Sequence, residues 1–266
     1  MPLQGLLGRI GPEVEDPEEE TFLLFSQDIP SQNLGFVDSR AAVLNLAVAD
    51  KDYVIHQSPT ILTSNREGGT TGAVVWKITP LVAEYLASSE TLLRSSGVLT
   101  SSSSVLELGC ERNISENVTQ TYPKTTNSTS QKRKGKHPAG RPQTNLRFTP
   151  LDWEQDEVTT SLTGDEAIRS FDVVLACDCI YNEALIPPLV QTCVDACKLR
   201  ALDTNFTDPT VCMVAQQLRD PDILESWMKE FHKSFRTWRI PEEALSKALR
   251  SNPGFVIHIG ILRDTA

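Results

Sequence analysis

The chain has 266 residues, of which 39% are hydrophobic and 23% charged, and this balance, ordinary for a soluble globular protein, excludes global disorder. The formal net charge of -10 disfavours direct nucleic-acid binding through general charge attraction and suits a basic partner, such as a lysine-rich protein. No run of 18 apolar residues occurs, so we expect no membrane span, and residues 1–10 lack the pattern of a secretory signal. We therefore expect a cytoplasmic protein, for which an additional nuclear location stays open.

The N-terminal part divides into an acidic lead and the start of a folded domain. Residues 1–34 are rich in Glu and Asp and predict a partly flexible lead, and the domain extends over residues 35–266. Residues 41–48 and 53–58 alternate as short strands do. A glycine-rich turn follows, and the apolar spacing of residues 74–93 predicts a helix.

The middle of the chain changes character abruptly. Val105-Leu-Glu-Leu-Gly109 is a short apolar run ending in glycine, which predicts a buried strand that enters a turn. Residues 111–145 contain few apolar residues and predict a disordered segment. A basic cluster between Lys132 and Arg141 fits either a solvated loop or a nuclear address or ribosomal RNA contact.

The C-terminal half alternates strands and helices. We expect strands at 146–153, 171–177, 210–215 and 255–262, helices at 182–199 and 222–231, and a hairpin partner for the last strand near 235–240. Such alternation predicts a mostly parallel sheet covered by helices on both faces. In that architecture a ligand binds at the carboxyl ends of the strands.

Six cysteines occur, and most lie in apolar stretches that indicate buried free thiols. Cys177-x-Cys179 and Cys193-x3-Cys197 resemble metal-binding spacings only loosely, and no histidine lies near them. We therefore expect no metal site.

Three predicted strand ends carry residues that could support chemistry. Gly109 would let a backbone turn approach a ligand closely. Asp152 and Trp153 could hold an adenine by hydrogen bonding and stacking, or Trp153 could be an ordinary core residue. Asp178 could hold a lysine ammonium in a channel lined by Tyr181, or it could simply cap the following helix.

Four motifs stand in a familiar order: Gly72-Ala-Val-Val-Trp76, Val105-Leu-Glu-Leu-Gly109, Leu151-Asp-Trp153 and Asp178-Cys-Ile-Tyr181-Asn182-Glu183. Together they resemble the fungal ribosomal lysine methyltransferase 5 family, within the methyltransferase-21-like group of seven-strand protein-lysine methyltransferases. The resemblance covers most of residues 20–265 and implies an α/β enzyme with a Rossmann-like sheet. We expect a monomer, because nothing in the sequence demands an oligomer.

The resemblance also implies the reactants and the site residues. The methyl donor would be S-adenosylmethionine, and the acceptor would be a lysine of a large-subunit ribosomal protein. Asp178 and Tyr181 would face that lysine. The residues that would border the cofactor are Trp76, Glu107, Gly109, Cys110, Trp153, Ala176 and Cys177.

The chain departs from the family pattern directly after Cys110. The family has a second glycine here, then a helix, a strand ending in a ribose-binding acid and a further helix, whereas this chain has Glu111 and no such strand. Roughly 35 to 40 residues are therefore absent, by a gene-model error or a real deletion. We expect one strand and its flanking helices to be missing from the sheet and S-adenosylmethionine to bind poorly or not at all.

Two other functions remain open at this point. The chain could be a catalytically inactive module that binds ribosomal proteins through the same surface. It could also be a small-molecule or nucleic-acid methyltransferase, because one fold hosts many reactions. No Asn-Pro-Pro-Tyr motif follows the strand at 171–177, which argues against methylation of nucleic-acid bases.

Overall fold

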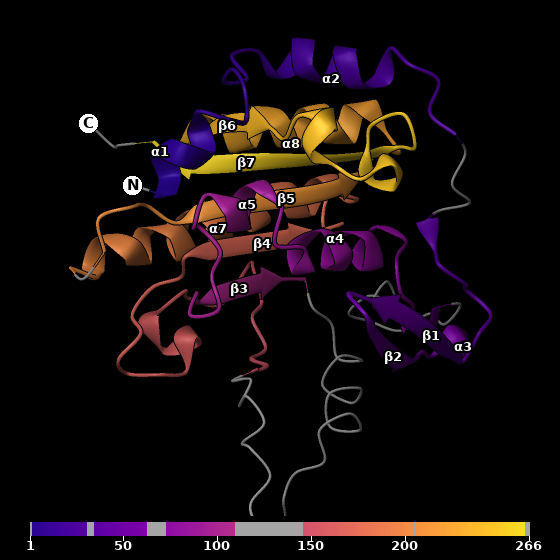
Figure 1. The fold of residues 1–266 in the computed structure, drawn as a ribbon, viewed down its shortest axis with the longest axis horizontal. Helices are drawn as coiled ribbons and strands as arrows, with labels where there is room; N and C mark the ends of the chain where they lie inside the picture. Colours follow the sequence, from indigo (N-terminus) through magenta and orange to yellow (C-terminus); the bar gives the residue numbers. More distant parts are fainter. Residues whose placement is uncertain (1, 31–34, 63–72, 110–145, 205, 264–266) are drawn as a thin grey trace, which may run out of the picture.

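The fold is a five-stranded sheet with helices on both faces and a separate two-stranded hairpin at one side (Figure 1). The computed structural model describes residues 2–30, 35–62, 73–109, 146–204 and 206–263. The expected disordered segment at 111–145 and Cys110 lie outside the described residues. None of the helices within these ranges is long and apolar enough to cross a membrane.

The main sheet has the strand order β3-β4-β5-β7-β6, in which β3, β4 and β5 pair in parallel and β7 pairs antiparallel with both β5 and β6. This arrangement agrees with the α/β, Rossmann-like expectation. The strands are β3 (Val105–Leu108), β4 (Val173–Cys177), β5 (Val211–Gln217), β6 (Phe235–Arg239) and β7 (Phe255–Leu262). Four of the five were expected from their apolar runs, and β6 is the expected hairpin partner of β7.

Alternate side chains of the strands feed two cores, one on each face of the sheet. Val174 and Cys212 pack on the side of α7 (Ile186–Lys198) and α8 (Pro221–Ser234). Leu175 and Met213 pack on the other side. That second side is covered by α1 (Pro2–Leu7), α4 (Ile78–Ala87) and α5 (Leu92–Ser95). Because both faces are covered, β4 and β5 are continuous apolar runs rather than alternating ones.

The strand β3 lies at one edge of the described sheet, and its side chains are poorly covered. Val105 is 45% exposed, whereas Val173 beside it on β4 is 2% exposed. This exposure agrees with the expected loss of a neighbouring strand. The expectation of a strand at 146–153 was wrong, since the described residues there form turns and extended chain. Backbone in a strand needs a partner for its N–H and C=O groups, and no described strand pairs with this segment.

Two N-terminal elements differ from expectation in their limits. The expected helix at 74–93 is divided into α4 and α5, because Ser88 has an extended backbone and Thr91 caps the second helix. The expected strand pair is present as β1 (Val43–Val48) and β2 (Lys51–His56), followed by the short α3 (Pro59–Leu62). The tight turn between β1 and β2 is held by Glu84 of α4, whose carboxylate accepts from Ala49 N at 2.8 Å.

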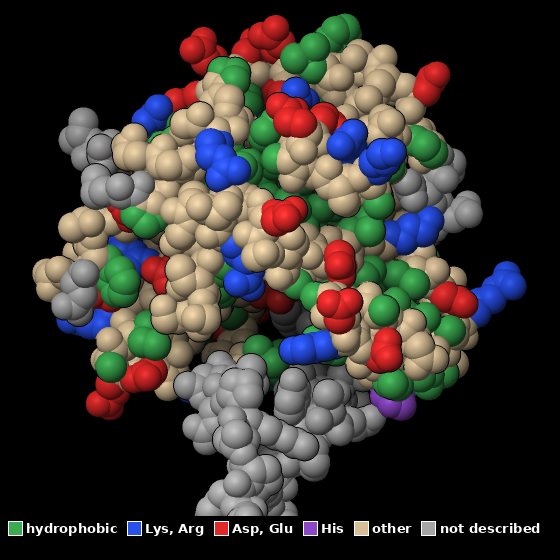
Figure 2. All heavy atoms as spheres, in the orientation of Figure 1, with side chains coloured by type: hydrophobic (Ala, Val, Ile, Leu, Met, Phe, Trp, Pro, Cys, Tyr) green, Lys and Arg blue, Asp and Glu red, His purple; other side chains and the backbone are tan. Residues whose placement is uncertain are grey.

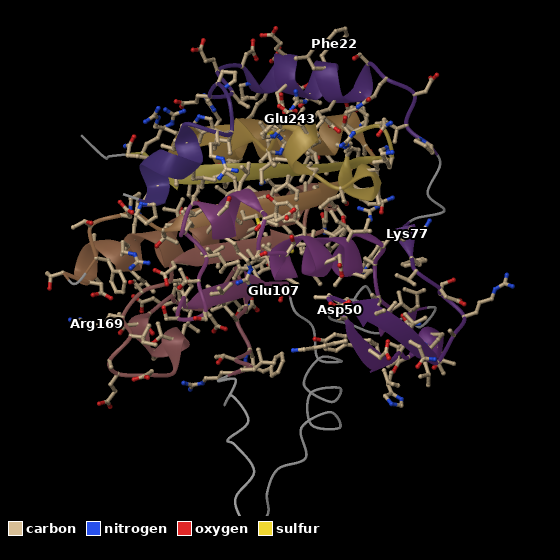
Figure 3. All side chains as sticks on the ribbon, viewed as in Figure 1. Phe22, Asp50, Lys77, Glu107, Arg169 and Glu243 are labelled. Atoms are coloured by element: carbon tan, nitrogen blue, oxygen red, sulfur yellow. The ribbon has the colours of Figure 1, made fainter. Side chains whose placement is uncertain are left out.

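The acidic lead is structured in its described part. Besides α1 it forms α2 (Pro17–Phe25), which is capped by Asp16 and lies along α8. Acidic side chains gather over α2 at the top of the view in Figure 2, and Phe22 points outward in Figure 3. The opposite side of α2 is buried, so the charge pattern that suggested flexibility is one face of an anchored helix.

A buried ionic contact anchors α2 to the sheet. The Glu20 carboxylate lies 2.9 Å from His258 Nε2 on β7 and 3.5 Å from Arg239 on β6. Burial alone would raise the pKa of Glu20, but the hydrogen bond and charge of His258 and the charge of Arg239 outweigh it and lower the pKa below its usual 4.5. The ionised form of Glu20 is therefore favoured by folding.

This contact predicts an acid-dependent stability. Because the folded pKa of Glu20 is lowered, its contribution is fully present above pH 4.5 and is lost as the pH falls through the lower folded value. We expect Glu20→Gln to be less stable than the parent at neutral pH and to lose less stability on acidification. Urea unfolding at several pH values measures this. The exposed neighbour Glu19→Gln should keep the parent's pH dependence, and identical behaviour of both variants would contradict the anchoring role.

Candidate functional site

The carboxyl ends of β3, β4 and β5 meet at one edge of the sheet, and the candidate site lies there. Asp178 follows β4 directly and has a left-handed backbone, with φ of 59°. A non-glycine residue is uncommon in that region, and Asp and Asn tolerate it best. The turn at Asp178 therefore directs the chain sharply out of the sheet and leaves its carboxylate at the strand end.

The Asp178 carboxylate is buried and paired with Arg219, which follows β5. Its side chain is 2% exposed, while that of Arg219 is 24% exposed. Arg219 donates from Nη1 to Oδ1 at 2.8 Å and from Nη2 to Oδ2 at 2.6 Å, a bidentate pair. The backbone N–H of Gln217 and the amide of Gln216 also donate to Oδ1. A buried charge needs such pairing to be tolerated.

Gln216 fixes the loop that carries the predicted catalytic residues. Its amide nitrogen donates to Ile180 O at 2.9 Å, and its Oε1 accepts from Ile180 N at 3.1 Å. Tyr181 comes next and is 47% exposed. A cavity of about 100 Å³ lies beside it, lined by Ile180, Tyr181, Gln216, Gln217, Arg219, Asp220, Ile223 and Leu224. Tyr181 and Arg219 thus line one cavity, and Arg219 joins that cavity to the buried Asp178 carboxylate.

The alternative that Asp178 is a helix cap is wrong. The capping residue is Asn182, whose side chain accepts from Ala184 N at 3.1 Å at the start of the short helix that leads into α7. Pro187 and Pro188 lie in the first turn of α7, where proline is tolerated, and so do not interrupt it. Asp178 therefore does not cap this helix.

A second group of predicted residues surrounds Gly109 at the end of β3. Gly109 has φ of 80°, and a Cβ placed on it would lie 2.6 Å from Cys179 Sγ and 3.8 Å from the Trp153 ring. Trp153 packs against the core on the α7 side. Asp152 accepts from Glu154 N and begins a tight turn rather than ending a strand. Glu107 of β3 is exposed at the same edge (Figure 3).

Trp76 and Cys177 lie on the other face of the sheet, against the α4 side. The Arg219 guanidinium lies over the Trp76 ring at 5.0 Å, so Trp76 is joined to Asp178 through Arg219. Burial, with the nearby carboxylates of Glu107 and Asp178, raises the pKa of the Cys177 thiol despite a hydrogen bond with Thr79. The two predicted indoles, Trp76 and Trp153, are therefore on opposite faces and form no common platform.

Ala176 of β4 is fully buried in the core, where it pairs with Leu108 of β3. Cys179, Cys193, Cys197 and Cys212 are buried free thiols, as the apolar context of the cysteines indicated. Burial raises the pKa of Cys179. Among the residues that the structure describes, no group of three or more His, Cys, Asp or Glu side chains has the geometry of a metal site.

Sequence reasoning missed Gln216, Gln217 and Arg219. The first two are 2% exposed, and all three contribute to holding Asp178. One pattern could have revealed them: two amides and a guanidinium directly follow an apolar run at the carboxyl end of a parallel strand. Polar groups in that position must find buried partners.

Comparison with known proteins identifies part of the chain. A family model described as lysine methyltransferase matches residues 132–222, about a third of the chain, including Asp178, Tyr181 and Arg219. Two curated proteins are similar over most of the chain. One is a diaminohydroxyphosphoribosylamino-pyrimidine deaminase of Schizosaccharomyces pombe, 27% identical over 88% of this chain and 55% of its own length. The other is a ribosomal lysine N-methyltransferase 5 of Vanderwaltozyma polyspora, 24% identical over 80% of this chain and 86% of its own.

The chain spans about half of the length of the deaminase relative. The family match and the second relative both support a methyltransferase.

Gly109 offers a direct test of the local packing. Gly109→Ala should lower the free energy of unfolding by about 2–4 kcal/mol, since it combines left-handed strain with a clash against Cys179. Gly97 has a similar φ of 83°, but its nearest neighbour would be 3.8 Å away, so Gly97→Ala should cost about 1–2 kcal/mol from strain alone. Urea unfolding measures both.

The clash can also be removed. Adding Cys179→Ala to Gly109→Ala should recover part of the loss, because the sulfur that meets the new Cβ is gone. Equal costs at Gly97 and Gly109 with no recovery would contradict the described packing.

Proposed function

We propose that this chain is an S-adenosylmethionine-dependent protein-lysine N-methyltransferase whose acceptor is a ribosomal protein of the large subunit. The observation that carries the proposal is the buried Asp178 carboxylate, held at the end of β4 beside the exposed Tyr181. Both residues fall within the segment that matches the lysine methyltransferase family. The acceptor half of this site is well formed, and the donor half is incomplete.

The acceptor half is suited to a cationic side chain. Asp178 Oδ1 already accepts from Arg219, Gln216 and Gln217, whereas Oδ2 accepts from Arg219 and has a further lone pair for an incoming ammonium. Tyr181 lines the approach with a partly apolar ring. An ammonium held there is oriented and stripped of water, and it must lose its proton before its nitrogen can attack a methyl group.

The donor half fits its cofactor only in part. S-adenosylmethionine would supply an electrophilic methyl group on a sulfonium. Among the described residues, the Glu107 carboxylate could accept from its amino group, Gly109 permits a close approach of the backbone, and Trp153 offers an indole surface. The second glycine of the family is replaced by Glu111. This substitution, together with the exposed β3, supports weak cofactor binding.

The comparison with the ribosomal methyltransferase supports a missing segment. It extends over 283 aligned positions but covers 80% of the 266 residues, or about 213, so about 70 positions have no residue in this chain. The comparison with the deaminase covers 240 positions for about 234 residues of this chain, so few of its positions lack a residue here. The missing positions are therefore a difference from the methyltransferase and not from the deaminase.

Methyl transfer tests the proposal. With large-subunit ribosomal proteins as acceptors, we expect lysine methylation only at high cofactor concentrations, and calorimetry should show no micromolar affinity for S-adenosylmethionine. Asp178→Asn should lower the rate at least ~10²-fold, because it removes the charge that orients the lysine. Asn is tolerated at the left-handed position, so the turn should persist.

Asp16→Asn is the matched control. It makes the same chemical change at the cap of α2, where Asn caps as well as Asp, and it should leave the rate unchanged. Micromolar cofactor affinity would contradict the incomplete donor half. Absence of methylation at every cofactor concentration, with ribosomal proteins still bound, would replace the enzyme by the binding module, a candidate favoured by Glu111 and the exposed β3.

A further inference from the structure

We infer that Arg219 occupies, from within the protein, the cation-binding position that an alkylammonium side chain of the substrate takes during the reaction. The inference rests on the proposed function, because it concerns the same acceptor site, and it assigns to Arg219 the role of a replaceable internal cation. Arg219 is a positioning residue here, and it decides which cations gain access to Asp178.

Three different kinds of cation ligand converge on the Arg219 guanidinium. The Asp178 carboxylate accepts two hydrogen bonds from it, at 2.6 and 2.8 Å. Gln217 Oε1 accepts a third at 2.9 Å. The Trp76 ring lies under it at 5.0 Å. A carboxylate, an amide oxygen and an aromatic face are the groups that hold an ammonium ion as well as a guanidinium.

The Trp76 wall of this cage is held by contacts that do not involve Arg219. Trp76 forms a backbone bridge with Phe36, and their rings lie 4.6 Å apart. Lys77 N donates to Gly35 O at 2.7 Å on the same pair of segments. A Cβ on Gly35 would lie 2.8 Å from Gln217 Cδ, so only glycine lets this segment close against the cage. The ligands would therefore remain in place if the guanidinium left.

Arg219 also controls the route to Asp178. Asp178 is almost fully buried and Arg219 is a quarter exposed, so the guanidinium covers the carboxylate on the solvent side. The cavity of about 100 Å³ next to Arg219 and Tyr181 is well below the roughly 300–1,000 Å³ of pockets for whole ligands. It suits one side chain. A lysine that enters through it meets Arg219 first and must share or replace its contacts.

The chemistry of the two cations makes exchange reasonable. A guanidinium binds a carboxylate through two parallel hydrogen bonds, whereas an ammonium is a compact point charge with three donors. An ammonium could therefore take Oδ2 and the Trp76 face while Arg219 retreats toward solvent. Arginine at position 219 thus keeps Asp178 neutralised until a competing cation arrives, and small monovalent ions in the solvent bind too weakly to replace it.

Cation rescue of an Arg219 variant tests the inference without cofactor or methyl transfer. The probe is butylammonium chloride, a mimic of the lysine side chain, compared with sodium chloride at equal ionic strength. Arg219→Gln leaves the cage without its cation. Its midpoint of thermal unfolding should rise by about 3 to 6 °C when butylammonium is at about ten times its dissociation constant. The parent protein should show a smaller rise than Arg219→Gln, because butylammonium must displace the guanidinium there before it can bind.

Arg236→Gln is the matched control. Arg236 also pairs with a carboxylate, that of Glu13, and also lies 5.0 Å from an indole, that of Trp238, but it is half exposed on β6. Butylammonium should not stabilise this variant. Arg219→Lys supplies its own ammonium and should behave as the parent does. An equal response of the Arg219 and Arg236 variants, or none in either, would overturn the inference.

A second measurement applies if Arg219→Gln does not fold. In the parent protein, the Arg219 Nε–H resonance should shift on titration with butylammonium and not with sodium chloride, while the Arg236 resonance stays in place. A static Arg219 resonance would overturn the inference. Failure of methyl transfer with a positive cation rescue would leave the cation site intact and refute the enzyme alone, so the two failures can be told apart.

Discussion

A carboxylate that is 2% exposed cannot remain ionised in a protein interior without compensation, and the pairing of Asp178 with Arg219 supplies it. The rest of the site depends on this constraint. Gln216 and Gln217 donate hydrogen bonds to the same carboxylate, and the Arg219 guanidinium lies over the Trp76 ring. Buried ion pairs are weak contributors to net stability. The presence of such a pair at the end of a strand is therefore better explained by a requirement for a charge there.

The strands that lead to the two halves of the proposed site are not equally well buried. On the acceptor side, β4 and β5 are buried between helices on both faces, so the loops after them start from rigid strands. On the donor side, β3 ends the sheet order and exposes Val105. An edge strand with apolar surface is also a site for unwanted pairing. The exposed margin at β3 therefore reduces the stability of this side of the sheet, and it supports the weak cofactor binding that we propose.

The sequence predicted the sheet better than the site. Apolar runs located β4, β5 and β7 because strands buried on both faces are apolar throughout. The strand expected at 146–153 failed because pairing is a property of the neighbour as well as of the segment. The acidic face of α2 hid a helix anchored by Glu20, since composition does not reveal which side of a helix is buried.

At the site itself, the motif placed Asp178 and Tyr181 at the right strand end, but three features depended on tertiary structure. Arg219 lies 41 residues from Asp178 in the chain, and no local pattern connects them. Capping by Asn182 instead of Asp178 follows from the left-handed turn, which was not visible in the residue order. The separation of Trp76 from Trp153 follows from the face of the sheet on which each packs.

A double-mutant cycle on Asp178→Asn and Arg219→Gln tests the central claim most directly. Urea unfolding of the parent, the two single variants and the double variant gives the coupling free energy of the pair. The account predicts a coupling of about 1.5–3 kcal/mol, as expected for residues in one hydrogen-bonded network. A coupling near zero would mean that Arg219 does not neutralise Asp178, and the description of the acceptor site would be contradicted.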